Sequence, residues 1–276
     1  MNASIRSWGV RLFLLAGIGL LACPPALAST VTDVFLYGTA AADGNHPNGR
    51  IMTIDYTTST VTATFNGPSD VVIGDGFTGT AFRSATGELY IVDGLGTNNI
   101  YRINSANGVV NSFFPSPTGA STIDGLEFVG DTLYGTVFGS GGLVKIDPDS
   151  GSLLDSLPFG PGSSSVLEGL GVVNGILYSR GDANTTIAAR SPVDGAILFS
   201  FATPDSAAVA GLAGFGGDLY AAADTGRIYR LNPLTGDVLD FIDIGITLDS
   251  LAAPTVPEPS TLALIGLASL ALFRRR

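Results

Sequence analysis

Short apolar stretches alternate with polar turns through most of the chain, and this pattern repeats. The dipeptide Leu-Tyr recurs at Leu36-Tyr37, Leu89-Tyr90, Leu133-Tyr134, Leu177-Tyr178 and Leu219-Tyr220. Successive copies are 53, 44, 44 and 42 residues apart. A period of this length is typical of repeat architectures, in which each repeat is one supersecondary unit that buries its apolar face against its neighbours.

A second apolar stretch follows each Leu-Tyr pair. Its copies span Arg50–Asp55, Asn99–Asn104, Gly142–Asp147 and Arg227–Asn232, with a degraded copy at Thr186–Ser191. In the last four repeats this stretch runs into a polar turn that ends in glycine, at residues 104–108, 147–151, 191–195 and 232–236. Asn, Asp or Ser caps such a turn, and glycine adopts the left-handed conformation that precedes a return strand.

The remaining apolar stretches complete four short strands in each repeat. The predicted return strands are Thr60–Phe65, Val109–Phe114, Ser152–Leu157, Ala196–Phe201 and Asp237–Ile242. A further strand precedes each later Leu-Tyr pair, at Gly79–Phe82, Gly125–Phe128, Gly169–Val172 and Gly211–Gly214. Four short strands per repeat are typical of the blade of a β-propeller.

The first repeat lacks its first strand, and a matching strand lies far along the chain. Residues Asp249–Ala253 follow the pattern of Asp124–Phe128. We therefore predict an all-β fold, a five-bladed β-propeller of four-stranded blades whose ring is closed by a C-terminal strand in blade one. Closure removes sheet edges that would invite aggregation. An open solenoid of β-repeats is the alternative, but it gives no reason for the displaced strand.

The composition agrees with an all-β protein. The 276 residues include 37 Gly and 15 Pro, while charged residues make up only 13%, which argues against a helical bundle. A hydrophobic share of 45% is enough to bury a core and argues against disorder. The five Leu-Tyr tyrosines are expected to be core residues. Over residues 31–253 the pattern resembles bacterial extracellular propellers of the WD40-like and quinoprotein-dehydrogenase-like group.

Residues 1–28 have the features of a secretory signal peptide. Two arginines precede the apolar run Leu12–Ala22, and Ala26–Ala28 offers small residues at a cleavage site, so cleavage is expected after Ala28. The alternative is Leu20–Cys23, which resembles a lipoprotein box whose cysteine would be lipidated. The bulky Leu21 and the prolines that follow the box favour ordinary cleavage.

The last 21 residues, 256–276, carry a second targeting element. Pro257, Glu258 and Pro259 are followed by an apolar run over Leu262–Phe273, and the chain ends on three arginines. The run has 12 residues, whereas a membrane-spanning helix needs about 20. Motif, short run and basic end occur in the order of the PEP-CTERM sorting tail, which this segment resembles. A plain C-terminal membrane anchor is the alternative.

The resemblance to the PEP-CTERM tail implies a partner and a route. A membrane protease, exosortase, would recognise Pro257, Glu258 and Pro259 and remove the tail after transient membrane anchoring through residues 262–273. The resemblance also implies a Gram-negative, polysaccharide-producing host. The protein is therefore expected at the cell surface or outside the cell, with extracellular polysaccharide as a further partner.

Between the two ends, residues 29–255 form the predicted propeller domain. They hold 23 acidic residues against 8 basic ones, a formal net charge of −15. Such a body repels nucleic acid and anionic lipid, so no nucleic-acid partner is expected. Cys23 is the only cysteine and lies in the signal segment, which excludes disulfides, thiolate metal sites and cysteine nucleophiles from the mature body.

Three carboxylates occupy equivalent positions in different repeats. The first positions of the innermost strands align as Thr78, Asp124, Glu168, Ala210 and Asp249. Innermost strands line the channel of a propeller, so Asp124, Glu168 and Asp249 are expected to converge near one channel mouth. Carboxylate oxygens suit Ca²⁺, and paired carboxylates also suit glycoside cleavage. Alternatively, each carboxylate accepts hydrogen bonds from backbone amides at the start of its strand. No organic cofactor is expected.

Two other features have simpler interpretations. Arg180-Gly181-Asp182 has the sequence of an adhesion tripeptide, but a lone tripeptide is common by chance. His46 is the only histidine, so it supports neither a multi-histidine metal site nor a Ser-His-Asp triad. It is expected in an exposed polar loop, within reach of Asp43.

Three functions fit this sequence. The first is a non-enzymatic binding platform at the cell surface or in the extracellular matrix. The second is a secreted glycoside hydrolase, or another propeller hydrolase, that uses the three carboxylates. The third is a lactonase-like or quinone-dependent propeller enzyme, for which the sequence has no distinctive ligand set. Enzymatic propellers tend to diverge between blades, so the regular repeats favour the binding platform.

Overall fold

The computed structural model describes residues 34–69, 77–94, 97–119, 121–138, 142–158, 168–180 and 185–254. These ranges form five antiparallel sheets of four strands each, with one short 3-10 turn at Pro204–Ser206. The predicted signal peptide with its cleavage site at Ala28, and the predicted tail with Pro257, Glu258 and Pro259, lie outside the described residues.

Each sheet is one blade, and its strands run from the central axis to the rim. Blade one contains β20 (Ser250–Ala252), β1 (Phe35–Ala40), β2 (Arg50–Asp55) and β3 (Thr60–Asn66). Blade two contains β4 (Gly79–Arg83), β5 (Glu88–Val92), β6 (Asn99–Asn104) and β7 (Val110–Pro115). Blade three contains β8 (Ile123–Val129), β9 (Thr132–Val137), β10 (Gly142–Ile146) and β11 (Leu153–Pro158). Blade four contains β12 (Leu170–Val173), β13 (Ile176–Arg180), β14 (Thr186–Arg190) and β15 (Ile197–Ala202). Blade five contains β16 (Val209–Phe215), β17 (Asp218–Ala223), β18 (Arg227–Leu231) and β19 (Val238–Asp243).

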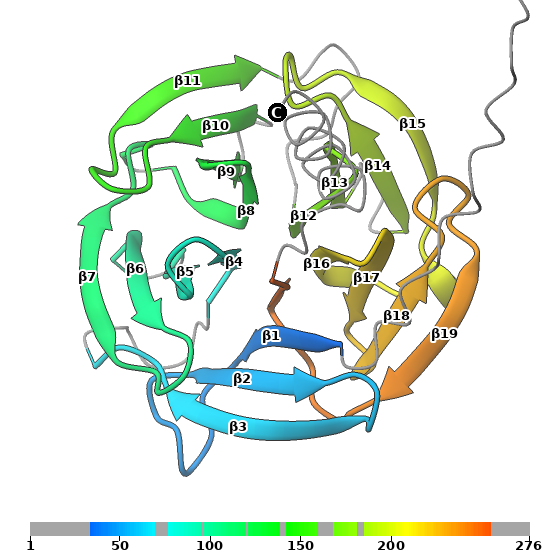
Figure 1. Ribbon diagram of the computed structural model, residues 1–276, viewed down its shortest axis with the longest axis horizontal. Helices are drawn as coiled ribbons and strands as arrows, with labels where there is room; N and C mark the ends of the chain where they lie inside the picture. Colours follow the sequence, from blue (N-terminus) through cyan, green and yellow to red (C-terminus); the bar gives the residue numbers. More distant parts are fainter. Residues whose placement is uncertain are drawn as a thin grey trace, which may run out of the picture. The chain divides into compact units, whose positions relative to one another are not determined.

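The C-terminal strand closes the ring in blade one, as predicted. β20 pairs antiparallel with β1, with Ser250 opposite Thr39 and Ala252 opposite Tyr37. Neighbouring inner strands contact one another around the whole ring, in the order β20, β4, β8, β12, β16 and back to β20. Figure 1 shows the five sheets around one axis, with β3, β7, β11, β15 and β19 along the rim. The prediction of a five-bladed propeller is therefore confirmed.

Glycine at one position of the inner strands lets the blades approach backbone to backbone. A methyl group added at Gly125 would lie 2.8 Å from the carbonyl carbon of Gly169. One added at Gly211 would lie 2.5 Å from the amide nitrogen of Leu251. Real Cβ atoms essentially never come so close to backbone atoms, so a larger residue would push two blades apart.

Blade one carries a serine where the other inner strands carry this glycine. The Ser250 hydroxyl forms hydrogen bonds with the hydroxyls of Thr39 in its own blade and Thr80 in blade two. All three side chains are buried. The ring is thus closed by side-chain hydrogen bonds as well as by the pairing of β20 with β1.

The polar turns before the return strands adopt the predicted conformation. The turn glycines all have φ between 72° and 77°, at Gly108, Gly151, Gly195 and Gly236. In blade three the Asp147 carboxylate accepts hydrogen bonds from the two amides that follow Pro148, at 2.8 and 3.0 Å. A register shift accompanies the turn in every blade, and each return strand after the first begins one residue later than predicted.

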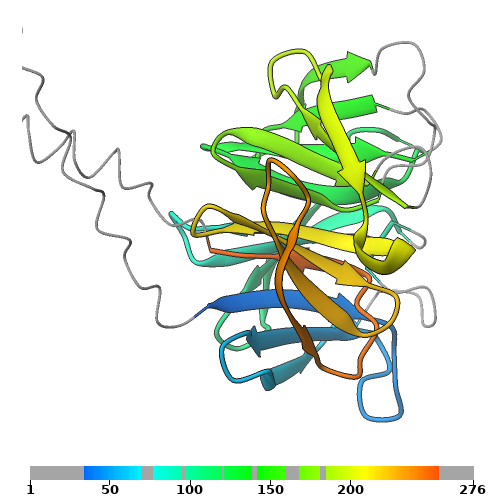
Figure 2. The ribbon, with the colours of Figure 1, turned by 90° about the vertical axis from the view of Figure 1, so that its right-hand side faces the viewer.

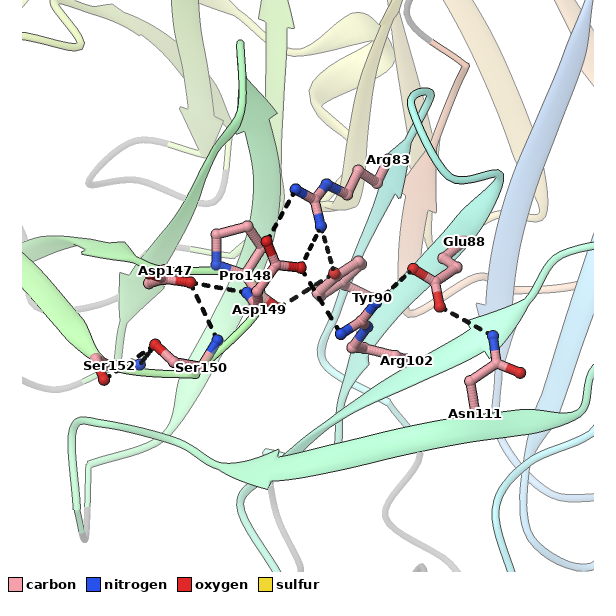
Figure 3. Close-up of polar contacts among 10 residues, drawn as sticks. All are labelled: Arg83, Glu88, Tyr90, Arg102, Asn111, Asp147, Pro148, Asp149, Ser150 and Ser152. Carbon is pink, nitrogen blue, oxygen red and sulfur yellow. Dashed lines mark hydrogen bonds and ion pairs between the residues drawn. The ribbon is translucent and has the colours of Figure 1, made fainter.

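Each of these turns also joins two blades. The Tyr90 hydroxyl of blade two donates a hydrogen bond to the Pro148 carbonyl in the turn of blade three, at 3.2 Å (Figure 3). In the same turn, Asp149 accepts a hydrogen bond from Arg83 of blade two at 2.7 Å. Tyr134 repeats the tyrosine contact with the next blade at 3.1 Å. At Tyr90 and Tyr134 the Leu-Tyr motif therefore connects neighbouring blades.

The prediction that the Leu-Tyr tyrosines are core residues is confirmed for four of them. Tyr90, Tyr134, Tyr178 and Tyr220 are buried. Tyr37 is partly exposed, and its ring stacks on that of Phe82 in blade two with centroids 5.1 Å apart.

Both ends of the described chain lie on the same face of the ring. Because β20 and β1 are antiparallel, Pro254 after β20 and Val34 before β1 lie at the same end of blade one. Figure 2 shows β1, in blue, crossing from this face to the other. We call the face where the inner strands begin the mouth face, and the face that holds Val34 and Pro254 the terminal face.

Glu127 is one of the buried carboxyl groups of the ring. Glu127 on β8 is 3% exposed and accepts a hydrogen bond from the Phe128 amide at 2.8 Å. Burial raises the pKa of Glu127 to about 8, although hydrogen bonds from the amides of Phe128 and Val172 oppose the rise. The Glu127 side chain is therefore mostly neutral in the folded protein at pH 7.

Substituting the turn glycines tests whether they serve the contact between blades. Gly87 and Gly151 both have left-handed φ, but an added methyl group meets nothing within 4 Å at Gly87 and lies 2.4 Å from the Phe114 ring at Gly151. We expect Gly87→Ala to cost about 1 kcal/mol of unfolding free energy through backbone strain alone. Gly151→Ala should cost roughly 1–3 kcal/mol more through overpacking. Equal losses in denaturant titrations would contradict the inter-blade role.

Glu127 gives the stability a pH dependence of predictable sign. In the unfolded chain it ionises near its ordinary pKa of 4.5, whereas in the folded chain it stays neutral until about pH 8. In this interval the unfolded state therefore binds fewer protons than the folded state. The contribution of Glu127 to stability consequently falls as the pH rises. We expect Glu127→Gln to reduce the fall in melting temperature with rising pH. Asp131→Asn, on an exposed turn, should leave that fall unchanged. Parallel profiles for Glu127→Gln and the unmutated protein would show that Glu127 does not titrate in this way.

Candidate functional site

A cavity of about 330 Å³ opens at the mouth face, where the inner strands begin. All five aligned first positions line it, together with three aromatic or polar neighbours. The lining residues are Phe77, Thr78, Thr122, Asp124, Phe138, Glu168, Ala210 and Asp249. The structure thus places the three carboxylates predicted from the sequence in one cavity, which we call the mouth cavity, with one carboxylate from each of blades three, four and one.

At two of these positions the residue lies in a β-bulge and is not paired with the neighbouring strand. In blade three, Ile123 lies opposite Val137 and Gly125 opposite Thr136, so Asp124 is the extra residue of a β-bulge. Ala210 occupies the same place in blade five. A bulge residue is unpaired and can point its side chain out of the regular alternation. The carboxylate of Asp124 consequently lies on the wall of the mouth cavity.

Backbone hydrogen bonds hold the other mouth positions to the second strands of their blades. The Asp249 amide donates to the Thr39 carbonyl at 2.8 Å, and the Arg180 amide donates to the Glu168 carbonyl at 3.1 Å. In blade two, the Thr78 hydroxyl donates to the Ile123 carbonyl at 2.6 Å, which connects it to blade three. The cavity wall is therefore built on strand ends.

Asp124 is the most enclosed of the three carboxylates. It is 6% exposed, and among the described residues it forms no hydrogen bond or ion pair. Burial raises the pKa of Asp124 to about 7; the nearby Glu168 charge adds to the rise, and Arg180 opposes it. Near neutral pH this side chain therefore exists in both protonation states.

Glu168 has a cationic partner that the sequence analysis missed. Its carboxylate forms an ion pair with Arg180, which is only 5% exposed. Arg180 also donates a hydrogen bond to the Val209 carbonyl of blade five at 3.5 Å. In the sequence, Arg180 stood out only as part of a chance tripeptide. Its place at the end of the Leu-Tyr strand of blade four, beside Glu168, was the signal that could have identified it.

Asp249 differs from Asp124 in the charges around it. Burial raises the pKa of Asp249 to about 6, Arg50 opposes the rise, and Asp224 adds to it. Arg50 is shared, because it also forms an ion pair with Asp43 at 3.4 Å. Asp249 therefore lies near charges from blades one and five, whereas Asp124 lies near charges from blade four.

The mouth cavity does not resemble a compact metal centre. Across the described ranges, no three His, Cys, Asp or Glu side chains are arranged so that they could hold a metal ion. His46 lies outside the cavity and pairs with Asp43 through Nδ1 at 2.9 Å, as expected from the sequence. What the cavity offers is a set of separate hydrogen-bond acceptors, two threonine hydroxyls and the half-exposed ring of Phe138.

Comparison with solved structures returns many propellers of low sequence identity. A protein of unknown function from Bacteroides caccae is 15% identical with a TM-score of 0.49, covering 76% of this chain and 73% of its own. Glutaminyl cyclase from Myxococcus xanthus is 17% identical with a TM-score of 0.49, covering 66% and 76%. A streptogramin B lyase is 17% identical with a TM-score of 0.47, covering 78% and 70%. No curated protein matches the chain.

The C-terminal residues match a known sorting signal. The PEP-CTERM protein-sorting motif matches residues 255–276, which confirms the resemblance seen in the sequence. The motif marks an exported protein that exosortase processes after transient membrane anchoring. Within the part of the chain that the structure describes, no helix is long and apolar enough to cross a membrane.

The body of the chain matches one family. The model of a repeat of unknown function (DUF6923) matches residues 25–171, which is more than half of the 276 residues. The matched region includes β1, β2 and β3 of blade one, the whole of blades two and three, and the first two residues of β12 in blade four. The chain therefore belongs to the DUF6923 repeat family and ends in a PEP-CTERM sorting motif.

Proposed function

We propose that this protein is a non-enzymatic binding platform at the cell surface or in the extracellular matrix, and that it holds extracellular polysaccharide in the mouth cavity. The observation that carries the proposal is the gathering of Asp124, Glu168 and Asp249, from three different blades, in a single cavity. A pocket of about 300–1,000 Å³ with a few convergent polar groups is typical of small-ligand sites.

The position of the chain ends supports a surface role. The sorting motif begins directly after Pro254, which lies on the terminal face. While that segment is anchored, the membrane is on the side of the terminal face, and the mouth face is turned away from it. The cavity is then accessible to polymers outside the cell.

The chemistry of the cavity wall suits a polyhydroxylated ligand. Carboxylates accept hydrogen bonds from sugar hydroxyls, and Thr78 and Thr122 add hydroxyl groups. The Phe138 ring, 46% exposed, offers an apolar surface to the C–H face of a sugar. Regular blades also support binding, because a catalytic site usually needs blades that differ more from one another.

Binding to polysaccharide tests this proposal directly. The mature protein released by expressing cells would be mixed with extracellular polysaccharide from the same cells, and the bound fraction measured by co-sedimentation. We expect Asp124→Asn with Glu168→Gln and Asp249→Asn to weaken binding at least about tenfold, a loss of about 1.4 kcal/mol. A matched control neutralises three exposed acids outside the cavity, namely Asp131, Asp155 and Asp240.

The control variant should bind like the unmutated protein, because its three substitutions lie outside the cavity. It has the same net charge as the cavity variant, so it isolates the effect of the cavity. Equal weakening by both variants would mean that overall charge, and not the cavity, governs the interaction. Absence of binding by the unmutated protein would contradict the platform. Release of reducing ends during the incubation would support the hydrolase instead.

A further inference from the structure

The mouth cavity has more negative charge than its own cations neutralise. Of its three carboxylates, only Glu168 has an ion pair, with Arg180. Asp124 faces Glu168 and Arg180, and Asp249 faces Arg50 and Asp224. An enclosed acid without a hydrogen-bond donor is costly, and Asp124 has none among the described residues, so its carboxylate is available to a donor group of a ligand.

We propose, on the basis of the proposed function, that the ligand presents a protonated amine to this cavity, as an amino-sugar residue of a polysaccharide does, and that Asp124 binds the ammonium group with Glu168 beside it. The sugar ring then lies against Phe138 at the edge of the cavity. The cavity then takes sugars that carry an amine, and Asp124 is the residue that selects them.

An ammonium group fits this geometry better than a metal ion. Ca²⁺ needs about six to eight oxygen ligands at about 2.3–2.6 Å, and the described side chains offer no compact group of three acidic or other ligating residues. An ammonium is held by one or two carboxylates, while hydroxyl or water oxygens accept its remaining N–H donors, so it needs no compact group of three acids. Such charge-assisted hydrogen bonds are stronger than those from a neutral hydroxyl.

Proton linkage distinguishes an amine from a neutral sugar. The pKa of Asp124 is raised to about 7 by burial and by the Glu168 charge, with Arg180 opposing, so part of the protein carries a proton there at neutral pH. A bound cation favours the ionised carboxylate and releases that proton. At pH values where the free amine is already fully protonated, affinity for it should therefore fall as the pH is lowered further, and its binding should release protons.

The experiment uses three oligosaccharides of equal length and linkage. These are β-1,4-linked tetramers of glucosamine, N-acetylglucosamine and glucose, titrated calorimetrically into the mature released protein in two buffers of different ionisation enthalpy. We expect the glucosamine tetramer to bind at least about tenfold more tightly than the other two. At a pH where the free amine is fully protonated, only its binding should show a heat that depends on the buffer.

Two variants separate the site from general charge attraction. Asp124→Asn should reduce glucosamine affinity at least about tenfold and abolish the buffer-dependent heat, while Asp131→Asn, which carries the same net charge, should change neither. Asp249→Asn provides a second cavity variant, and unchanged melting curves show that each variant is folded. Equal weakening by Asp124→Asn and Asp131→Asn would overturn the assignment.

Failure of this inference is distinguishable from failure of the platform. Equal binding of all three tetramers, or binding without proton release, would overturn the amine while leaving a polysaccharide platform in place. Binding of the glucosamine tetramer but not of the native polysaccharide would support the amine and contradict the proposed polymer. Ca²⁺ could instead raise the melting temperature, with the rise abolished by Asp124→Asn and no tetramer bound. That result would show that the cavity binds Ca²⁺ and not an amine.

Discussion

The close approach of the inner strands at the central axis is the constraint on which the rest of this structure depends. Five blades meet there, and an added methyl group at Gly125 or Gly211 would come within 2.8 Å of the next blade's backbone. The glycines therefore set how closely the sheets can pack, and that packing buries the apolar faces between blades. In blade one Ser250 occupies the position of this glycine. Its hydroxyl forms hydrogen bonds with two threonine hydroxyls at the same close approach.

The candidate site is a consequence of this ring. The residue directly before the glycine position of each inner strand lies at the mouth cavity, so each blade contributes one side chain to a common wall. The frame needs glycine or serine at one position and leaves its neighbour free to vary. The neighbours are Thr78, Asp124, Glu168, Ala210 and Asp249. A regular scaffold thus carries an irregular, acidic surface, which suits recognition of one ligand by several blades.

The two faces of the ring differ in what they can do. The terminal face holds both ends of the described chain, and the mouth face holds the cavity. Under the proposed function this separation matters, because processing of the C-terminal motif at one face would not obstruct binding at the other. Arg180 adds a further distinction, since it pairs with Glu168, whereas the enclosed Asp124 has no donor among the described residues.

The sequence by itself determined the repeat, the four strands per blade, the closing strand and the sorting motif, because turn chemistry and strand patterns are local and recur in register. It also aligned the three carboxylates, since equivalent positions in repeats lie around one ring. Only the tertiary structure decided how each acid is surrounded. Burial of Asp124 depends on a bulge between β8 and β9, and the ion pair of Glu168 depends on the side-chain conformation of Arg180. Phe138 and Thr122 reach the cavity from outside the aligned positions, because packing between blades, and not the repeat pattern, determines which loop residues face the axis.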